Sequence, residues 1–453
     1  PALNAAVSRG GPVIPVYVYA PDEEGHWPPG AASRWWLHYS LIELQRTLTK
    51  HSAQLIIERG DSATILQKLA GTTNADTVYW NRRYEPSVEK RDERVRKTLE
   101  QHGIRGRSFN GALLFEPNAI ATGSGEPYKV FTPYWKACMK AEEPDAPANA
   151  PERILSPKHT PRSLTVDDLD LLPQIDWAGG LRETWTPGEI GAHDRLKSFL
   201  DEALVEYEKQ RNYPAVNGTS RLSPHLHHGE ISPARIWHEV SKRRNLYRKD
   251  TKRNAADSFL REIGWREFAH HVLYHFPHTT DKPLQRKFRK FPWRRNKRML
   301  AAWQHGRTGY PAVDAAMREL WHTGWMHNRM RMVVASFLVK HLLQPWQDGS
   351  AWFWDTLVDA DLANNSLGWQ WAAGCGADAA PYFRIFNPTT QGEKFDADGK
   401  YIRHWLPELA DLPTKYVFKP SEAPPDTLRQ AGIRLGETYP EPIVEHAKAR
   451  QRA

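Results

Sequence analysis

Cysteine is almost absent from this chain, and its scarcity excludes several classes of protein. Cys138 and Cys375 are the only two among 453 residues, too few for a disulfide framework or a cysteine-rich metal site. Long apolar runs are missing as well. The best candidate, residues 330–343, is short and contains Arg331 and Lys340, whereas a membrane-spanning helix needs about 20 mostly apolar residues. With no secretion signal at its start, we predict a cytoplasmic protein without a membrane partner.

Tryptophan and positive charge are abundant instead. The chain has 19 Trp, 16 Tyr and 15 Phe, and 62 Lys and Arg exceed 53 Asp and Glu to give a net charge of +9. So many indoles exceed what a core requires and suggest stacking on planar ligands or electron movement. The positive balance favours an anionic partner, nucleic acid first.

Two patterns divide the chain. Strand-like runs at 13–19, 54–57 and 77–80 alternate with helical spacing at 37–48, which predicts an α/β domain with a parallel, Rossmann-like sheet over residues 1–135. Residues 136–188 are rich in Pro, Ala and acids and predict an interdomain linker. Residues 189–453 predict an all-α domain, with N-caps at Ser223 and Ser232, each followed by Pro at the first helical position.

Residues 217–224 suggest a phosphate site. They place a glycine, three hydroxyl groups and an arginine just before a predicted helix start. Backbone N–H groups, hydroxyl donors and a guanidinium together suit a diphosphate. A well-capped helix after a polar loop explains the pattern about equally well.

The most basic stretch runs from Asp281 to Leu300. Its nine cations are Lys282, Arg286, Lys287, Arg289, Lys290, Arg294, Arg295, Lys297 and Arg298. Phe288, Phe291 and Trp293 lie between them, a combination that fits contact with a phosphate backbone. Most such runs are solvated faces, but the charge of the whole chain favours DNA.

Helical spacing groups one set of residues around an asparagine. Trp321, Trp325, Asn328 and Met332 recur at i, i+4, i+7 and i+11, which predicts one shared helix face with Arg331 beside it. Such a stripe is usually core, yet an asparagine inside it needs a hydrogen-bond partner if it is buried. The stripe therefore hints at a polar ligand.

Helical spacing also places Glu262, Trp265 and Arg266 together, at i, i+3 and i+4. This is either a surface salt-bridge pattern or a pocket wall that stacks a base and accepts its N–H.

Residues 359–371 carry the densest polar chemistry. Two carboxylates, side-chain amides and two indoles exceed the needs of a structural loop. We reject metal ligation because no His or Cys joins the acids at ligand spacing. The pair His227 and His228 is interpreted as surface or capping histidine, and no hydrolase elbow or P-loop motif occurs.

These segments resemble the photolyase/cryptochrome family of flavoproteins, and the resemblance covers essentially the whole chain. The matching stretches are residues 80–86, 130–135, 218–224, 264–268, 324–329, 364–371 and 380–392. Family members begin with a strand before a Pro-Ala-Leu segment, so we expect that first strand to be missing from a sequence that starts at Pro1. Residues 34–41 look most like the bacterial class III enzymes, relatives of plant cryptochromes, so the expected type is class I/III.

The resemblance implies FAD in the helical domain. The residues expected to hold it are Tyr207, Thr219, Ser220, Arg221, Leu222, Ser223, Arg331, Asp359, Asp361 and Asn365. Asp359 is expected to pair with Arg331, Asp361 to face the ring or ribityl chain, and Asn365 to face flavin N5. An uncharged amide at that last position is the photolyase pattern, whereas plant-type cryptochromes carry Asp.

The activity implied is light-driven repair of cyclobutane pyrimidine dimers, by electron transfer from excited, reduced FAD to a dimer flipped out of DNA. The residues expected to contact DNA or the lesion are Arg211, Glu262, Trp265, Arg266, Asn328, Met332, Trp371 and Arg384. Glu262 is expected to hydrogen-bond a pyrimidine edge. Asn328 and Met332 stand where 6-4 photolyases carry a His pair, which favours cyclobutane dimers.

Three tryptophans, Trp369, Trp346 and Trp293, match the family's relay, through which oxidised FAD is photoreduced. An antenna pigment is expected on the α/β domain, methenyltetrahydrofolate by resemblance to class III, with a deazaflavin open. The expected partner is DNA containing pyrimidine dimers, bound by a monomer.

Two other functions stay open. A cryptochrome-type blue-light receptor has the same fold without repair, and Asn365, Asn328 and a chain that ends soon after residue 444 weigh against it. A single-strand nucleic-acid binder would use the basic, aromatic surface alone, and a co-purifying yellow flavin would exclude it.

Overall fold

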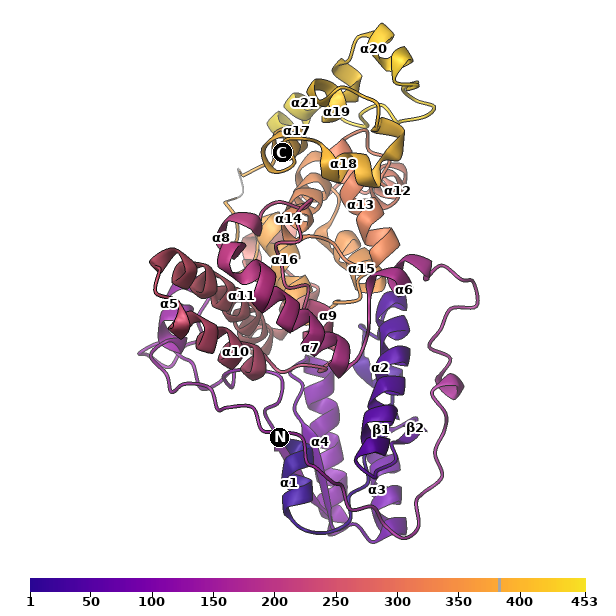
Figure 1. Ribbon diagram of the computed structural model, residues 1–453, viewed down its shortest axis with the longest axis vertical. Helices are drawn as coiled ribbons and strands as arrows, with labels where there is room; N and C mark the ends of the chain where they lie inside the picture. Colours follow the sequence, from indigo (N-terminus) through magenta and orange to yellow (C-terminus); the bar gives the residue numbers. More distant parts are fainter. Residues whose placement is uncertain (382–383) are drawn as a thin grey trace. The chain divides into compact units, whose positions relative to one another are not determined.

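The computed structural model describes residues 1–381 and 384–453 (Figure 1). The chain forms two compact units, and each is described by itself. The α/β unit comprises residues 1–177, 185–200 and 221–277, and the helical unit comprises residues 178–184, 201–220 and 278–453. Tyr382 and Phe383, which belong to one of the matching stretches, lie outside the described residues. The domain boundaries predicted after residues 135 and 188 remain a prediction.

Two small parallel sheets form the strand part of the α/β unit. β1 (Val16–Tyr19) pairs with β2 (Ile56–Arg59), and β3 (Thr77–Asn81) pairs with β4 (Arg105–Phe109). The helices α2 (Ala31–Lys50) and α4 (Pro86–Gln101) connect the strands of each pair, as parallel strands require. The predicted α/β class is confirmed, although β1 begins only after Pro15, which has no N–H to donate to a ladder.

The α/β unit contains further helices. They are α1 (Ala2–Ser8), α3 (Ser62–Thr73), α5 (Phe131–Cys138), α7 (Glu189–Ser198), α9 (Ser223–His227), α10 (Pro233–Leu246) and α11 (Asp250–His275), with short 3₁₀ turns η1 (Pro21–Glu24) and η2 (Asp167–Leu169). Leu41 and Leu48 of α2 and Ile57 of β2 lie in one buried cluster. Gly264 lets α11 approach α5 closely, because a Cβ there would lie 2.4 Å from the Trp135 ring.

The helical unit contains the remaining helices. They are α6 (Gly179–Thr184), α8 (Tyr207–Gln210), α12 (Lys297–Gln304), α13 (Pro311–Thr323), α14 (Asn328–Ser336), α15 (Trp346–Thr356), α16 (Leu362–Ala373), α17 (Pro388–Phe395), α18 (Lys400–Trp405), α19 (Thr414–Val417), α20 (Pro425–Gln430) and α21 (His446–Arg452), with a π-helical turn η7 (Phe337–His341) and a 3₁₀ turn η6 (Arg286–Lys290). Its buried core includes Trp303, Trp346 and Trp369. Among the described residues, no helix combines the length and apolar character needed to cross a bilayer.

The single helix face predicted for Trp321, Trp325, Asn328 and Met332 is wrong. α13 ends at Thr323 because Gly324 adopts a left-handed conformation, with φ of +66°, and α14 begins only at Asn328. Trp321 is 59% exposed while Trp325 is 6% exposed. Asn328 is also exposed, so the argument from a buried asparagine fails.

One of the two predicted N-caps is confirmed. The Ser232 hydroxyl accepts a hydrogen bond from Arg235 N at 3.1 Å, with Pro233 at the first position of α10. Ser223 is already the first residue of α9, so the other predicted cap is off by one residue. α9 has only five residues, and its backbone dipoles therefore sum to little.

Candidate functional site

Asp361 and Asn365 occupy the first turns of α16 in the helical unit. Asp361 caps the helix, since its Oδ1 accepts hydrogen bonds from Asn364 N and Nδ2, both at 2.7 Å. The Asn365 amide nitrogen donates to the carbonyl and the hydroxyl of Ser350 on α15, both at 3.0 Å. These bonds assign the amide orientation. The Asn365 Oδ1 is therefore the atom left to accept a hydrogen bond.

The expected pair of Arg331 and Asp359 is present. Arg331 Nη2 donates to both Asp359 oxygens, at 2.8 and 3.0 Å, and Arg331 Nε donates to the carbonyl of Met326 at 2.8 Å. The Asp359 side chain is only 3% exposed, and a buried carboxylate needs such a partner. The pair fixes a guanidinium next to the start of α16.

Two further polar groups on α16 fit a bound polar ligand. Within the described part of the chain, the buried Ser366 Oγ and Trp369 Nε1 have no hydrogen-bond partner. Buried polar atoms are normally satisfied. The helix that carries Asp361 and Asn365 thus leaves donors that a flavin could use.

The suggested phosphate segment contains a strained residue. Arg221 has φ of +49°, a conformation uncommon for a residue that is not glycine and often found where a ligand is held. Burial and the nearby Arg221 charge lower the pKa of Arg195 to about 10. The Arg195 guanidinium lies over the Trp185 ring at 4.7 Å. Two neighbouring guanidinium groups in the α/β unit favour an anion at this segment.

A buried triad supports the same segment, and sequence reasoning missed it. Glu230 accepts from Trp36 Nε1 at 2.9 Å and lies 2.5 Å from His225 Nδ1. All three side chains are buried. Because His225 lies on α9, this network fixes the helix that follows Arg221.

The residues Glu262, Trp265 and Arg266 follow one face of α11, as predicted. The Trp265 ring stacks on Phe131 of α5 at 3.8 Å and 11°, so one indole face is already covered. Arg266 Nη1 donates to the Ala112 carbonyl at 2.7 Å. The Arg266 guanidinium therefore holds a loop of its own unit, a bond that the prediction of a DNA contact did not anticipate.

Glu267, next to Arg266, is fully buried and was not predicted. Its Oε2 accepts from Leu114 N at 2.8 Å and from Phe115 N at 3.2 Å. Burial raises the pKa of Glu267 to about 7, against the opposing charge of Arg266. Together these bonds attach residues 112–115 to α11.

The three tryptophans predicted to form a relay belong to the helical unit. Trp369 and Trp346 are buried in its core, and Trp293 is partly buried against that core. Two hydrogen bonds tie the Trp293 segment to the turn before Trp346, from Arg294 N to Leu343 O at 2.7 Å and from Gln344 Nε2 to Asn296 O at 2.5 Å.

Gly349, one turn after Trp346, lies against the Trp369 ring, because a Cβ there would be 2.1 Å from a ring carbon. Trp303 and Phe353 also surround Trp369, with ring centroids at 6.1 and 5.0 Å. A glycine inside a helix was a sequence signal that could have revealed this close approach.

The other predicted DNA contacts are dispersed over the helical unit. Met332 and Trp371 are partly buried on α14 and α16, and Arg384 is exposed. The Arg211 guanidinium lies 5.4 Å from the Tyr207 ring centroid. Their roles toward a lesion remain predictions.

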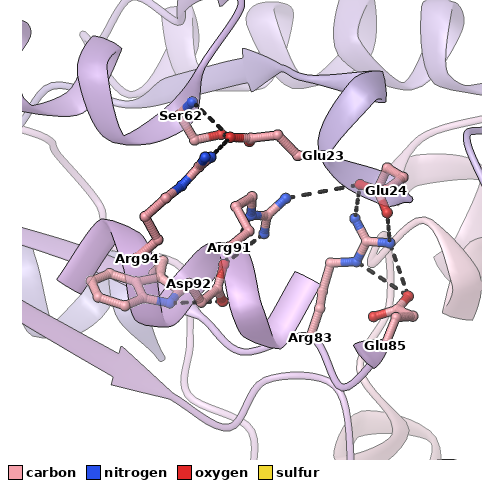
Figure 2. A network of polar contacts seen from close by, with 9 residues as sticks. Glu23, Glu24, Ser62, Arg83, Glu85, Arg91, Asp92 and Arg94 are labelled. Atoms are coloured by element: carbon pink, nitrogen blue, oxygen red, sulfur yellow. Dashed lines mark hydrogen bonds and ion pairs between the residues drawn. The ribbon is translucent and has the colours of Figure 1, made fainter. Parts of the chain in front are cut away.

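A network of ion pairs organises the 80–86 stretch of the α/β unit (Figure 2). Arg83 donates to Glu24 of η1 at 2.9 Å and to Glu85 at 2.9 Å. Arg94 of α4 pairs with Glu23, which also accepts from Ser62 of α3. Because these cations are paired within the unit, we assign the stretch a structural role.

Comparison with known proteins identifies the class. The family model described as DNA photolyase matches residues 1–152, and the model described as FAD binding domain of DNA photolyase matches residues 259–453. The deoxyribodipyrimidine photo-lyase of Agrobacterium fabrum is 51% identical over all of this chain and 93% of its own. Cryptochrome-1 of Arabidopsis thaliana is 41% identical over 99% of this chain and 67% of its own.

A solved structure agrees with these matches. The bacterial class III photolyase from Agrobacterium tumefaciens superimposes with a TM-score of 0.96 at 50% identity, over all of this chain and 92% of its own. The chain therefore belongs to the photolyase/cryptochrome family and has its FAD-binding domain. Within that family it is similar to a class III bacterial photolyase at 50% identity.

Proposed function

We propose that this chain is a deoxyribodipyrimidine photo-lyase that repairs cyclobutane pyrimidine dimers in DNA under blue light. The observation that carries the proposal is the Asn365 amide, anchored by Ser350 so that Oδ1 is its free atom. A reduced flavin carries a hydrogen at N5, and a neutral acceptor facing it stabilises the reduced form without a charge that opposes it.

FAD, when bound and reduced, supplies the light-excited electron that splits the dimer. The Arg331–Asp359 pair would fix the flavin's surroundings, Asp361 would face the ring or ribityl chain, and Tyr207 would lie nearby. The diphosphate would take its hydrogen bonds from residues 219–223. Arg195 supports this assignment, because its charge lies close to that of Arg221 and two guanidinium groups attract an anion. Sequence reasoning did not predict the role of Arg195.

The residues predicted to contact the lesion keep the roles that the family resemblance implies. Glu262 would accept an N–H from a pyrimidine edge, and Trp265 and Trp371 would each contact the dimer. Met332 would pack against the dimer and Asn328 would contact it. Arg211, Arg384 and the basic run would meet the phosphates, in a binding mode that weakens as salt rises.

The three tryptophans of the relay would reduce oxidised FAD and would take no part in the repair reaction itself. Trp369, Trp346 and Trp293 would pass an electron inward to oxidised FAD. Their order runs from buried core to partly exposed surface, which supports this direction.

The antenna, compartment and oligomeric state stay proposals. Methenyltetrahydrofolate is our first choice for the antenna and a deazaflavin the second. A monomer in the cytoplasm fits two cysteines that are both buried and free.

The second candidate is a blue-light receptor, favoured by the 41% identity with a plant cryptochrome. One assay separates the two. Blue light should restore intact pyrimidines in an oligonucleotide with a single cyclobutane dimer, and a dark control should not change. A 6-4 photoproduct oligonucleotide should remain unrepaired. A flavin-loaded protein that binds the dimer and never turns over would be a receptor.

A further inference from the structure

Trp293, the outer end of the relay, lies inside the most basic stretch of the chain. Lys290, Arg294 and Arg295 flank it in sequence, and all three side chains are exposed. Phe291 packs on the indole, with ring centroids 4.3 Å apart. The surface end of the proposed relay is therefore a partly exposed indole among cations.

Few acids neutralise these charges. Across residues 286–298, all of which the structure describes, no cation forms an ion pair with an acid within 4.0 Å, and Lys282 reaches Asp281 only at 4.0 Å. Asp348 is the acid near Arg295, and burial raises the pKa of that carboxyl. The positive potential around Trp293 is thus largely uncompensated.

The inner end of the relay behaves differently toward protons. Trp369 is only 2% exposed, so bulk water does not reach its Nε1 to take a proton when the indole is oxidised. Trp293 is partly exposed, and water can take its proton there. Oxidation should therefore come to rest on Trp293, where an external donor must refill it.

We propose that this donor is a small anionic one-electron reductant, an enediolate of the ascorbate kind, drawn to Trp293 by Lys290, Arg294 and Arg295. The donor anion loses one electron and becomes a radical. The oxidised Trp293 gains that electron and, where it has lost its N–H proton, one proton from water. The inference rests on the proposed function, because it assumes that FAD is reduced through this relay.

Electrostatic steering sets the expected size of the effect. A surface of one sign raises the encounter rate of an oppositely charged molecule by roughly 10 to 10³. The effect is screened beyond about 8 Å at physiological ionic strength. An anionic donor should therefore react faster than a neutral one of equal potential, and only its rate should fall as salt is added.

Transient absorption on the FAD-loaded, oxidised protein tests this directly. After a flash, the decay of the tryptophan radical is followed against the concentration of ascorbate, or of a hydroquinone that is neutral at pH 7. The triple variant Lys290→Glu, Arg294→Glu and Arg295→Glu should lower the ascorbate rate constant about 10-fold or more. The hydroquinone rate constant should stay within twofold.

A matched control changes charge elsewhere. Lys50, Lys68 and Lys136 are exposed residues of the α/β unit, and their change to Glu alters the net charge equally. This control should keep the ascorbate rate constant of the wild type. Equal losses in both triple variants, or none in either, would overturn the proposal.

A failure of the relay itself is recognised separately. If Trp293→Phe leaves the radical signal unaltered, Trp293 is not the outer end of the relay and the inference is wrong, while dimer repair by chemically reduced enzyme can still be observed.

A measurement without flavin covers a variant that binds FAD poorly. The fluorescence difference between wild type and Trp293→Phe should be quenched by iodide more strongly than by caesium, and the triple variant should reverse that order.

Discussion

At the scale of single residues, the proposed function depends on the direction of one amide. The Asn365 nitrogen donates to the Ser350 carbonyl, and a carboxyl at this position can do so only when protonated. We expect Asn365→Asp to retain flavin. The pKa of the new carboxyl should be raised, because an ionised carboxylate oxygen facing the Ser350 carbonyl oxygen costs about 1–3 kcal/mol. Dimer repair should fall more than tenfold, and photoreduction under reductant should give a different absorption spectrum.

Asn254→Asp on α11 is the matched control for that prediction. Asn254 is exposed and should tolerate the same change with repair near the wild-type level. If both variants repair dimers normally, Asn365 does not face the flavin.

Gly349 sets the position of Trp369. Within a helix, alanine is favoured over glycine by about 1 kcal/mol, but a Cβ here would lie 2.1 Å from the Trp369 ring. Overpacking of a core typically costs about 1–3 kcal/mol, so we expect Gly349→Ala to lower the thermal midpoint and slow photoreduction. Gly368→Ala on α16 meets nothing within 4 Å and should raise the midpoint instead. An equal rise of the thermal midpoint in both variants would show that the Trp369 ring moves aside without loss of stability.

Glu267 makes stability depend on pH in a defined direction. Its folded-state pKa of about 7 exceeds the unfolded value of 4.5, so the folded state holds the proton between these values. The stability from this group is complete below pH 4.5 and is lost as pH rises through 7. Glu267→Gln keeps an acceptor for Leu114 and Phe115 but has no proton to lose. As pH rises from 4.5 to 8, its free energy of unfolding should increase relative to that of the wild type by up to roughly 3 kcal/mol. Urea unfolding at several pH values measures this, and a difference that does not vary with pH would contradict the assignment.

The family resemblance named the residues expected at the site. It did not name the hydrogen-bond partners that fix the orientation of those side chains. The Arg331–Asp359 pair was expected from the family resemblance. Ser350 could not be expected, since the bond to Asn365 joins two helices, and neither could Glu267, whose partners lie some 150 residues away in the chain.

At the scale of elements, periodicity identified α2 and α11 but failed between α13 and α14. The helical spacing of the side chains continues through Gly324 in the sequence. In the structure, Gly324 adopts a left-handed conformation that ends the helix. β4 was missed because Arg105–Phe109 shows no apolar alternation. Such a strand forms because its backbone pairs with β3, and pairing between distant strands leaves little trace in local pattern.

The packing of α5 on α11 gives the element-scale prediction. Trp265 stacks on Phe131, so its loss removes an internal contact as well as any contact with a lesion. We expect Trp265→Ala to weaken binding of dimer-containing DNA by about 1–3 kcal/mol with flavin retained. Phe131→Leu removes only the internal stack and should leave lesion affinity within about threefold. Equal losses in the two variants, measured by fluorescence anisotropy, would make Trp265 a packing residue.

At the scale of the whole molecule, the net charge, the tryptophan content and the α/β plus helical architecture were readable from sequence, and the family matches agree with them. The cryptochrome relative is 41% identical over 99% of this chain, so the fold alone does not separate a receptor from an enzyme. That separation depends on whether a reduced flavin delivers its electron to a dimer.

The most direct measurement compares repair by wild type and Trp346→Phe, with and without reduction of the flavin by dithionite beforehand. Phe conserves an aromatic filler but is much harder to oxidise than Trp, so it would interrupt the proposed relay while the core stays packed. The account predicts that both proteins, once reduced, repair a dimer-containing oligonucleotide equally under blue light. Starting from oxidised flavin with an external reductant, only the wild type should recover repair. Absence of repair by the pre-reduced wild type would contradict the central claim that this chain is a photolyase.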